Sequence, residues 1–302
     1  MNKHISTIFY ITLLLVSAVL PGCIKEEGGA DCPTAAHYLM VRSYDADNKE
    51  ITGTGAVRDV VLYVFDHNGA YLGKITGMEN TPIPLTYPEG ANLHIVGWGN
   101  SGGGNQVMPD LAAGTPLANA SVKLINTKAD NPETNVSSPD DLFWGNTDVS
   151  LVTPQGETGE IRHDLSVKRK AASMNISVKG LQGWANTTDT DFSIVVHGSR
   201  NTIDFGGNNT GDPAAYKPAL LLNNNGIFTT GIFNTFPSGD IVVSIDIYKG
   251  TNKIYTVAAD KMGKPFVLQE GRLLNVFIDF TGTGNVSFTV TEWGKIDINQ
   301  EF

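Results

Sequence analysis

A cysteine near the start of the chain is the residue whose surroundings most clearly predict covalent chemistry. Residues 5–20 are almost all apolar and follow Lys3, and this run is shorter than the roughly 20 residues that a membrane-spanning helix needs. It is typical of a secretory signal peptide. Because Cys23 directly follows the small residue Gly22, the site resembles a bacterial lipobox. We expect signal peptidase to remove residues 1–22 by cutting between Gly22 and Cys23, leaving Cys23 acylated. An ordinary signal peptide followed by a chance cysteine is the alternative.

Lipid on Cys23 would place the protein at a membrane surface. One acyl chain binds a membrane only marginally, whereas two or three anchor it stably. Residues 23–36 would form a flexible tether, and its charged start, Lys25-Glu26-Glu27, resembles the export signal of Bacteroidetes surface lipoproteins. A merely solvated tether is the other interpretation. Cys32 is then the remaining thiol, either free or paired with another molecule.

No other motif supports catalysis or a cofactor. The segment 97–102 matches G-x-G-x-x-G, but the glycines and Pro109 that follow cannot open the helix that dinucleotide binding requires. His163, Asp164, His197 and Ser199 could form a hydrolase set, but the chain lacks the G-x-S-x-G nucleophile elbow. It also lacks H-E-x-x-H and zinc-type Cys/His spacing. We therefore predict no enzymatic activity, no cofactor and no metal.

Four tryptophans could stack on sugar rings, but packing in a core or at a sheet edge is the commoner use of such residues. They are Trp98, Trp144, Trp184 and Trp293.

The composition excludes some partners and favours a β-protein. Loss of residues 1–22 would leave 20 basic and 31 acidic residues, a formal net charge of −11. A chain this acidic has no electrostatic basis for binding nucleic acid. Charged residues make up only 17% of the chain and there are 33 glycines, a composition typical of an extracellular β-protein with many turns.

Alternating apolar residues predict strands throughout the chain. The clearest is 57–66, where both faces are apolar, so we expect it to be central in its sheet. No segment keeps a helical period over three turns. Residues 154–160 carry no apolar side chain apart from the proline ring and mark a predicted boundary. We predict two all-β sandwich domains, residues 37–159 and 160–302.

The order of several short motifs resembles the anchor-subunit branch of the fimbrillin family, the lipoproteins at the base of Bacteroidetes pili. The motifs are Cys23 with its acidic tether, 59–71 (DVVLYVFDHNGAY), 92–100 (NLHIVGWGN), 141–145 (DLFWG) and 290–302 (VTEWGKIDINQEF). The resemblance implies two tandem transthyretin-like β-sandwiches, exposure at the cell surface on the outer membrane, and assembly with neighbouring pilins by strand exchange.

The last strand of the chain is the candidate donor for such an exchange. Val286, Phe288 and Val290 alternate with polar residues and lead to Trp293, so they could fill the open groove of a neighbouring sandwich. The alternative is that this strand folds back into its own domain.

Two arginines bear on maturation, since polymerising members of the family are cut after an arginine behind the first strand. Arg42 lies inside the predicted first strand, whereas Arg58 follows the flexible stretch 52–56 and is the possible site of cleavage. An anchor must escape this cut to keep its lipid. We predict a lipid-anchored pilus base, with a stalk or tip pilin or a surface glycan-binding lipoprotein as alternatives.

Overall fold

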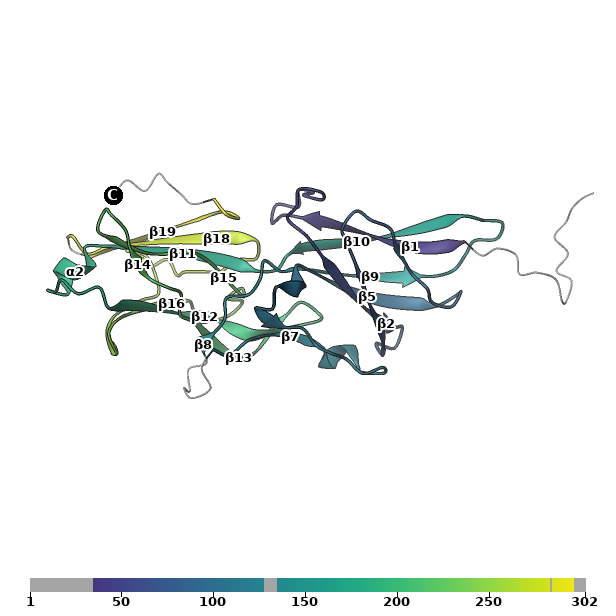
Figure 1. Cartoon of the computed structure of the whole chain (residues 1–302), viewed down its shortest axis with the longest axis horizontal. Coiled ribbons are helices and arrows are strands. Elements are labelled where there is room, and N and C mark those ends of the chain that lie inside the picture. The colour runs from purple at the N-terminus through teal and green to yellow at the C-terminus, as the bar shows by residue number, and fades with distance from the viewer. Residues whose placement is uncertain (1–34, 128–134, 283, 296–302) are drawn as a thin grey trace, which may run out of the picture. The chain divides into compact units, whose positions relative to one another are not determined.

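The computed structural model describes residues 35–127, 135–282 and 284–295 of this protein. Nearly all regular structure within them is strand, which confirms the predicted all-β fold class (Figure 1). The helical elements there are the single turn α2 (Leu181–Trp184) and two 3-10 segments, η1 (Ser101–Gly103) and η2 (Leu117–Asn119). In this part of the chain, no helix is long and apolar enough to cross a membrane.

The first sheet has seven strands in the order β3-β2-β5-β9-β10-β1-β4. Its strands are β1 (Ala36–Tyr44), β2 (Val60–Asp66), β3 (Tyr71–Gly77), β4 (Ile83–Pro84), β5 (Asn92–Gly99), β9 (Phe143–Ser150) and β10 (Glu160–Arg169).

Strand β2 is an interior strand of this sheet, with a neighbour on each side, as its two apolar faces predicted. It pairs with β3 on one side and β5 on the other. Val60, Leu62 and Val64 point into one apolar cluster, whereas Tyr63 and Phe65 point into a second cluster on the opposite face. Both faces are therefore buried, because successive side chains of a strand point to opposite sides.

The DLFWG motif needs its glycine where β9 approaches β10. A Cβ atom on Gly145 would lie 2.0 Å from the carbonyl oxygen of Ser166, which is far too close for any larger residue. Gly145 therefore lets the two backbones meet.

The second sheet has five strands in the order β14-β15-β11-β18-β19. They are β11 (Ala172–Lys179), β14 (Leu221–Leu222), β15 (Ile227–Thr235), β18 (Arg272–Asp279) and β19 (Asn285–Glu292).

The third sheet has seven strands and includes short strands from the first half of the chain. Its members are β6 (Gln106–Val107), β7 (Ser121–Leu124), β8 (Asn135–Val136), β12 (Phe192–Asp204), β13 (Asn209–Tyr216), β16 (Ser244–Lys249) and β17 (Asn252–Val257). Because β7 pairs with β12 and β8 pairs with β13, the two halves of the sequence interlock in this sheet.

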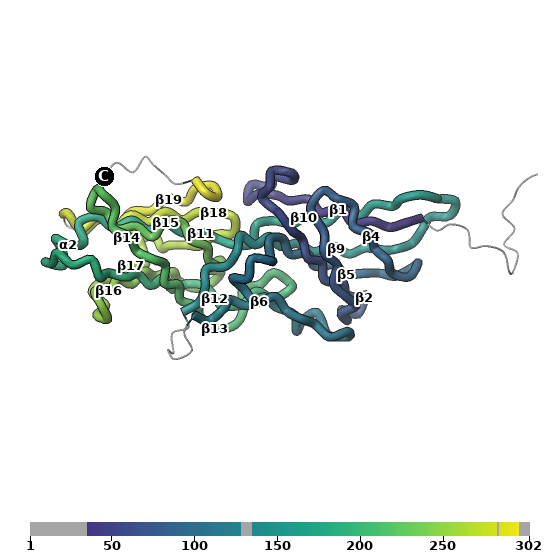
Figure 2. Tube along the Cα trace, in the orientation of Figure 1, coloured from purple at the N-terminus to yellow at the C-terminus, as the bar shows by residue number. Residues whose placement is uncertain are grey.

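The change from one sheet to the next lies after β10. The two sandwich domains predicted for 37–159 and 160–302 remain a prediction, but β10 pairs in parallel with β1 along the whole length of β1. The first sheet therefore runs past residue 160 as far as Arg169. Only Lys170 and Ala171 separate β10 from β11, which belongs to the second sheet, as the tube in Figure 2 traces.

One apolar core continues from the first sheet into the other two. Phe205, directly after β12, lies with its ring centroid 4.8 Å from that of Tyr63 and 6.0 Å from that of Trp98. All three side chains are almost completely buried. The long strand β12 therefore carries an aromatic residue of the second half into the core of the first.

Candidate functional site

The predicted lipidation site is upstream of the described residues. Gly22, Cys23 and Cys32 lie outside them, so the signal-peptidase cut and the acylation remain predictions. What the structure describes is where this end of the chain enters the fold. Strand β1 begins at Ala36, whose backbone N–H donates a hydrogen bond to the carbonyl oxygen of Gly159. The predicted tether therefore leads directly into the first sheet.

Strand β1 is held inside that sheet. It pairs with β10 on one side and with the two residues of β4 on the other. Leu39 and Val41 are completely buried in the core of this sheet. Arg42 lies within β1, as the sequence predicted, and its side chain points to the surface.

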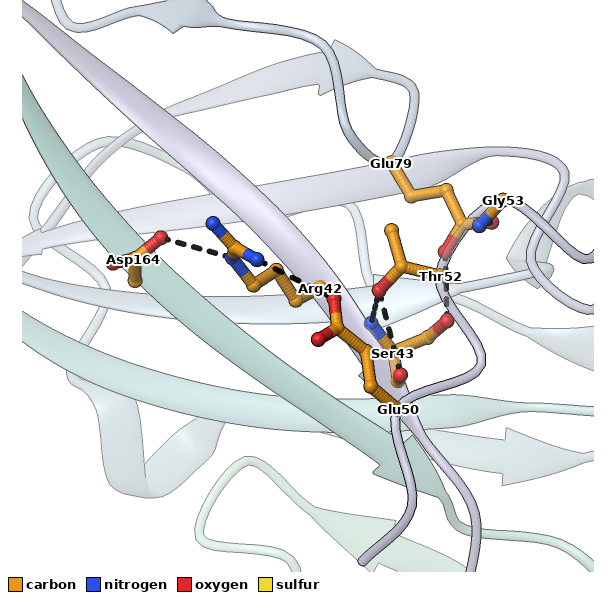
Figure 3. A network of polar contacts seen from close by, with 7 residues as sticks. All are labelled: Arg42, Ser43, Glu50, Thr52, Gly53, Glu79 and Asp164. Carbon is orange, nitrogen blue, oxygen red and sulfur yellow. Dashed lines mark hydrogen bonds and ion pairs between the residues drawn. The ribbon is translucent and has the colours of Figure 1, made fainter.

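Two acidic residues hold the Arg42 side chain. Its guanidinium lies 3.4 Å from an oxygen of Asp164 on β10 and 3.4 Å from an oxygen of Glu50 in the following loop (Figure 3). Hydrogen bonding and charge from Asp164, followed by the charge of Glu50, raise the pKa of Arg42. The cation therefore connects β1 both to its neighbouring strand and to the loop that leaves it.

A second set of contacts fastens the same loop to β1. Ser43 donates its hydroxyl to Glu79 at 2.7 Å, and Glu79 also accepts the backbone N–H of Gly53 at 3.0 Å (Figure 3). The backbone N–H of Ser43 donates to the hydroxyl of Thr52 at 3.0 Å. The stretch that the sequence predicted to be flexible is therefore held at several points.

Arg58, the possible maturation site, has an exposed side chain but a restrained backbone. Its N–H donates to the side-chain oxygen of Asn100 at 2.8 Å. The amide nitrogen of Asn100 donates to the carbonyl of Ala56 at 2.7 Å, and its backbone N–H donates to the carbonyl of Asp59 at 3.0 Å. Asn100 therefore binds the backbone on both sides of Arg58, and residue types along 52–58 gave no signal of this contact.

The candidate donor strand is β19, which the structure pairs with β18 of its own chain from Asn285 to Glu292. Val286 is buried, Phe288 is half-buried, and Val290 is 40% exposed. The apolar face of β19 thus becomes more open towards its end. Donation of this strand to a neighbour remains a prediction, since the structure holds a single chain.

Trp293 directly follows this strand, and its ring contacts the buried cation of Arg169. The guanidinium of Arg169 lies over two rings, 4.5 Å from the centroid of Trp293 and 4.7 Å from that of Phe143. Both ends of the guanidinium also donate to Asp141, at 2.7 and 3.0 Å. Burial raises the pKa of Asp141, and Arg169 opposes that shift. The contact joins the DLFWG motif at 141–145 to the motif that begins at residue 290.

The remaining candidates for chemistry have other partners. Ser199 shares a hydrogen bond with the hydroxyl of Tyr216 at 3.0 Å, and His197 lies 3.2 Å from Asp246. Among the described side chains, no group of three or more His, Cys, Asp or Glu is arranged to hold a metal ion.

The tryptophans divide by burial. Trp98 is fully buried, and Trp144 is half-buried, donating from its indole to the Phe205 carbonyl at 3.3 Å. Trp184 is 45% exposed and stacks on Phe280 with ring centroids 4.6 Å apart. Trp184 is thus the most accessible of the four predicted platforms.

Comparison with known proteins identifies close relatives in sequence and in fold. The family model described as "Fimbrillin-A associated anchor proteins Mfa1 and Mfa2" matches residues 29–299. The chain is 29% identical over 317 residues to the major fimbrium anchoring subunit FimB of Porphyromonas gingivalis, covering 99% of each chain.

Two solved structures share the fold. The fimbrial anchor protein Mfa2 from Porphyromonas gingivalis is 15% identical, with a TM-score of 0.61 over 87% of this chain and 98% of that one. A putative adhesin from Bacteroides ovatus is also 15% identical, with a TM-score of 0.65 over 88% of this chain and 96% of that one.

Proposed function

This chain belongs to the family of fimbrillin-A associated anchor proteins, and we propose that it ties a fimbrium to the outer membrane through lipid on Cys23. It is a fimbrial anchoring subunit of the cell surface. Its family is structural, and we infer a structural rather than a catalytic role. The single observation that carries the proposal is the family match across residues 29–299, which covers nearly the whole chain after the predicted signal peptide.

The way β1 is held supports the lipid-anchored form of this proposal. A chain acylated at Cys23 stays attached to its membrane only while β1 remains part of the fold and the bond after Arg58 is intact. Both requirements are consistent with the burial of Leu39 and Val41 and with the contacts of Asn100 around Arg58. These features favour an uncut anchor over a polymerising stalk or tip pilin.

Assembly with the neighbouring pilin is proposed to use β19. The strand lies at the edge of its sheet, and an edge strand presents backbone groups that can pair with another chain. Its apolar residues are only partly covered from Phe288 onward. We propose that β19 takes part in strand complementation with the adjacent subunit.

Intact-mass analysis of the native protein from the cell envelope tests the anchor proposal. We expect an acylated chain that begins at Cys23 and ends at Phe302, and that co-purifies with pilins. A chain without lipid that begins at Asp59 would contradict the proposal and identify a polymerising pilin instead. A lipidated chain that binds polysaccharide and no pilin would favour the glycan-binding alternative.

A further inference from the structure

The chain enters and leaves the β1–β10 pair at opposite ends. The two strands are parallel and paired over nine positions, from Ala36 opposite Glu160 to Tyr44 opposite Lys168. The tether joins β1 at Ala36, whereas the rest of the molecule continues from β10 after Arg169. A pull on the tether and an opposing pull from the later part of the chain would therefore act along the strands in opposite directions.

Two side-chain contacts also connect the strands of this pair, and a third joins β10 to the loop that follows β1. The contacts are His37–His163 at 2.9 Å, Arg42–Asp164 at 3.4 Å, and Asn48–Lys168 at 2.6 Å.

The first of these contacts has the geometry of a direct ring-to-ring hydrogen bond. The two imidazoles are nearly coplanar, with an interplanar angle of 11° and centroids 5.2 Å apart. That separation places the nitrogens of His37 and His163, which are 2.9 Å apart, close to the line between the centroids. The rings therefore meet edge to edge, and one N–H bridges β1 and β10 where the tether arrives.

The direction of pulling decides how such a pair breaks. Hydrogen bonds between parallel strands are evenly spaced along the pair. When the strands are pulled at opposite ends, these bonds share the load and must fail together. When they are pulled apart at the same end, the bonds open one after another. Resistance to force follows the rate of unfolding rather than the equilibrium stability.

We propose that β1 and β10 form a shear clamp, a strand pair that carries tension between the lipid tether and the fimbrium. The inference rests on the proposed anchor function, because lipid on Cys23 supplies one end of the load. The contacts of Glu79 with Ser43 and Gly53 add to the clamp, since they hold the loop that would have to follow β1 out of the sheet.

Single-molecule stretching in two pulling directions tests the clamp without changing it. The sample is the mature chain, residues 23–302, with Cys32→Ser so that Cys23 alone attaches the tether to the surface. The second attachment is Thr190→Cys, beyond β10, which loads β1 and β10 at opposite ends. The matched control attachment is Gln155→Cys, just before β10, which peels the same strands apart from one end. Both substituted residues are exposed in loops.

Both directions release the same segment, so the same event can be compared. Detachment of β1 frees residues 36–59, and these 24 residues at about 3.4 Å each lengthen the chain by about 80 Å. We expect this step to require at least about twofold more force with the Thr190 attachment than with the Gln155 attachment.

Equal or lower force in the Thr190 direction would overturn the proposal, as would an earlier release of any other segment at lower force. Such a result would leave the anchor function intact, because lipidation and pilin capture are measured independently of which strands break first. Conversely, a native chain beginning at Asp59 would refute the anchor function whatever force β1 withstands.

Discussion

At the scale of single residues, Asn100 has the most direct bearing on the maturation of this protein. Its backbone is left-handed, with φ of 58°, and its side chain is 97% buried. From this position it binds the backbone at Ala56 and Arg58. A protease must draw several residues around its cut into an extended form, so cleavage after Arg58 requires these bonds to open first.

We therefore expect Asn100→Gly to expose Arg58 to proteolysis. Glycine accepts the left-handed backbone but cannot make the side-chain hydrogen bonds. Cleavage after Arg58 by an arginine-specific protease, followed by mass spectrometry, should be at least about tenfold faster, equivalent to about 1.4 kcal/mol of local opening free energy.

The matched control is Asn80→Gly, another left-handed asparagine, with φ of 56° and an exposed side chain. It should leave the cleavage rate after Arg58 unchanged. If the protease cleaves the native protein after Arg58 as fast as it cleaves the Asn100→Gly variant, this explanation is wrong.

The His37–His163 pair gives the protein a specific dependence on pH. Burial, and next the neighbouring His37, lower the pKa of His163 from its ordinary value, while Asp164 acts in the opposite direction. Glu89 also lies close to the pair, 4.0 Å from His37. Because the unfolded chain takes up a proton near pH 6.5 and folded His163 does so only at lower pH, acid favours unfolding.

The unfolding free energy should therefore fall as the pH drops through about 6.5, and the fall should level off once folded His163 is protonated too. Urea denaturation between about pH 7.5 and 5 should show a smaller decrease for His163→Gln than for the native protein. An unchanged slope in the His163→Gln protein would rule out this histidine as the cause.

At the scale of elements, strand β19 is fully paired with β18 along one edge, but the side chains on its apolar face are only partly buried. Eight residues pair with β18, yet Val290 remains 40% exposed. Arg169 secures the end of the strand through Trp293, and the ring of Phe288 lies 5.4 Å from that of Phe266. Strand β19 is thus fully paired with β18 of its own chain. It still lies where a strand from a neighbouring subunit could take its place or pair with its free edge.

A reversible covalent lock distinguishes these uses of β19. Phe277 and Ser287 are opposite each other in the β18–β19 pairing, so Phe277→Cys with Ser287→Cys can form a disulfide. If β19 must leave β18 to complement a pilin, the oxidised variant should lose at least about 90% of pilin binding, and reduction should restore it.

The control is the double variant Val61→Cys with Thr76→Cys, which can link β2 to β3 in the first sheet. It should bind pilin in both its oxidised and its reduced state. Equal binding by oxidised and reduced F277C/S287C would show that β19 stays in place, leaving only its free edge for assembly.

At the scale of the whole molecule, the described residues after Thr34 cluster as one compact unit. The shared core around Phe205 and the pairing of β7 with β12 connect regions that the sequence assigned to separate domains. Such connections suit a subunit under tension, because a force applied at β1 is distributed over many packed residues and not over a single linker. The acidic charge of the chain adds no attraction to an anionic surface, so the proposed membrane attachment depends on the predicted lipid at Cys23.

Much of this protein could be predicted from the sequence by itself. The apolar run at 57–66 identified strand β2, whose successive side chains point to opposite faces whatever its partners. The spacing around Cys23 predicted lipidation, and the short motifs in their order indicated the family that the comparison confirmed. These signals are local, since each depends on residues a few positions apart.

Only the tertiary structure decided how distant segments combine. It placed β10 in the first sheet and showed β13, whose glycine, aspartate and proline obscured the strand pattern. It showed β12 as a single strand of 13 residues that continues through two irregularities in its pairing with β13. It also brought Arg169 over the rings of Phe143 and Trp293, and Asn100 against the backbone of Arg58. Strand pairing and such contacts join residues that are tens of positions apart in the sequence. The pattern of apolar residues within one segment does not indicate which distant segment will pair with it or cover its apolar face.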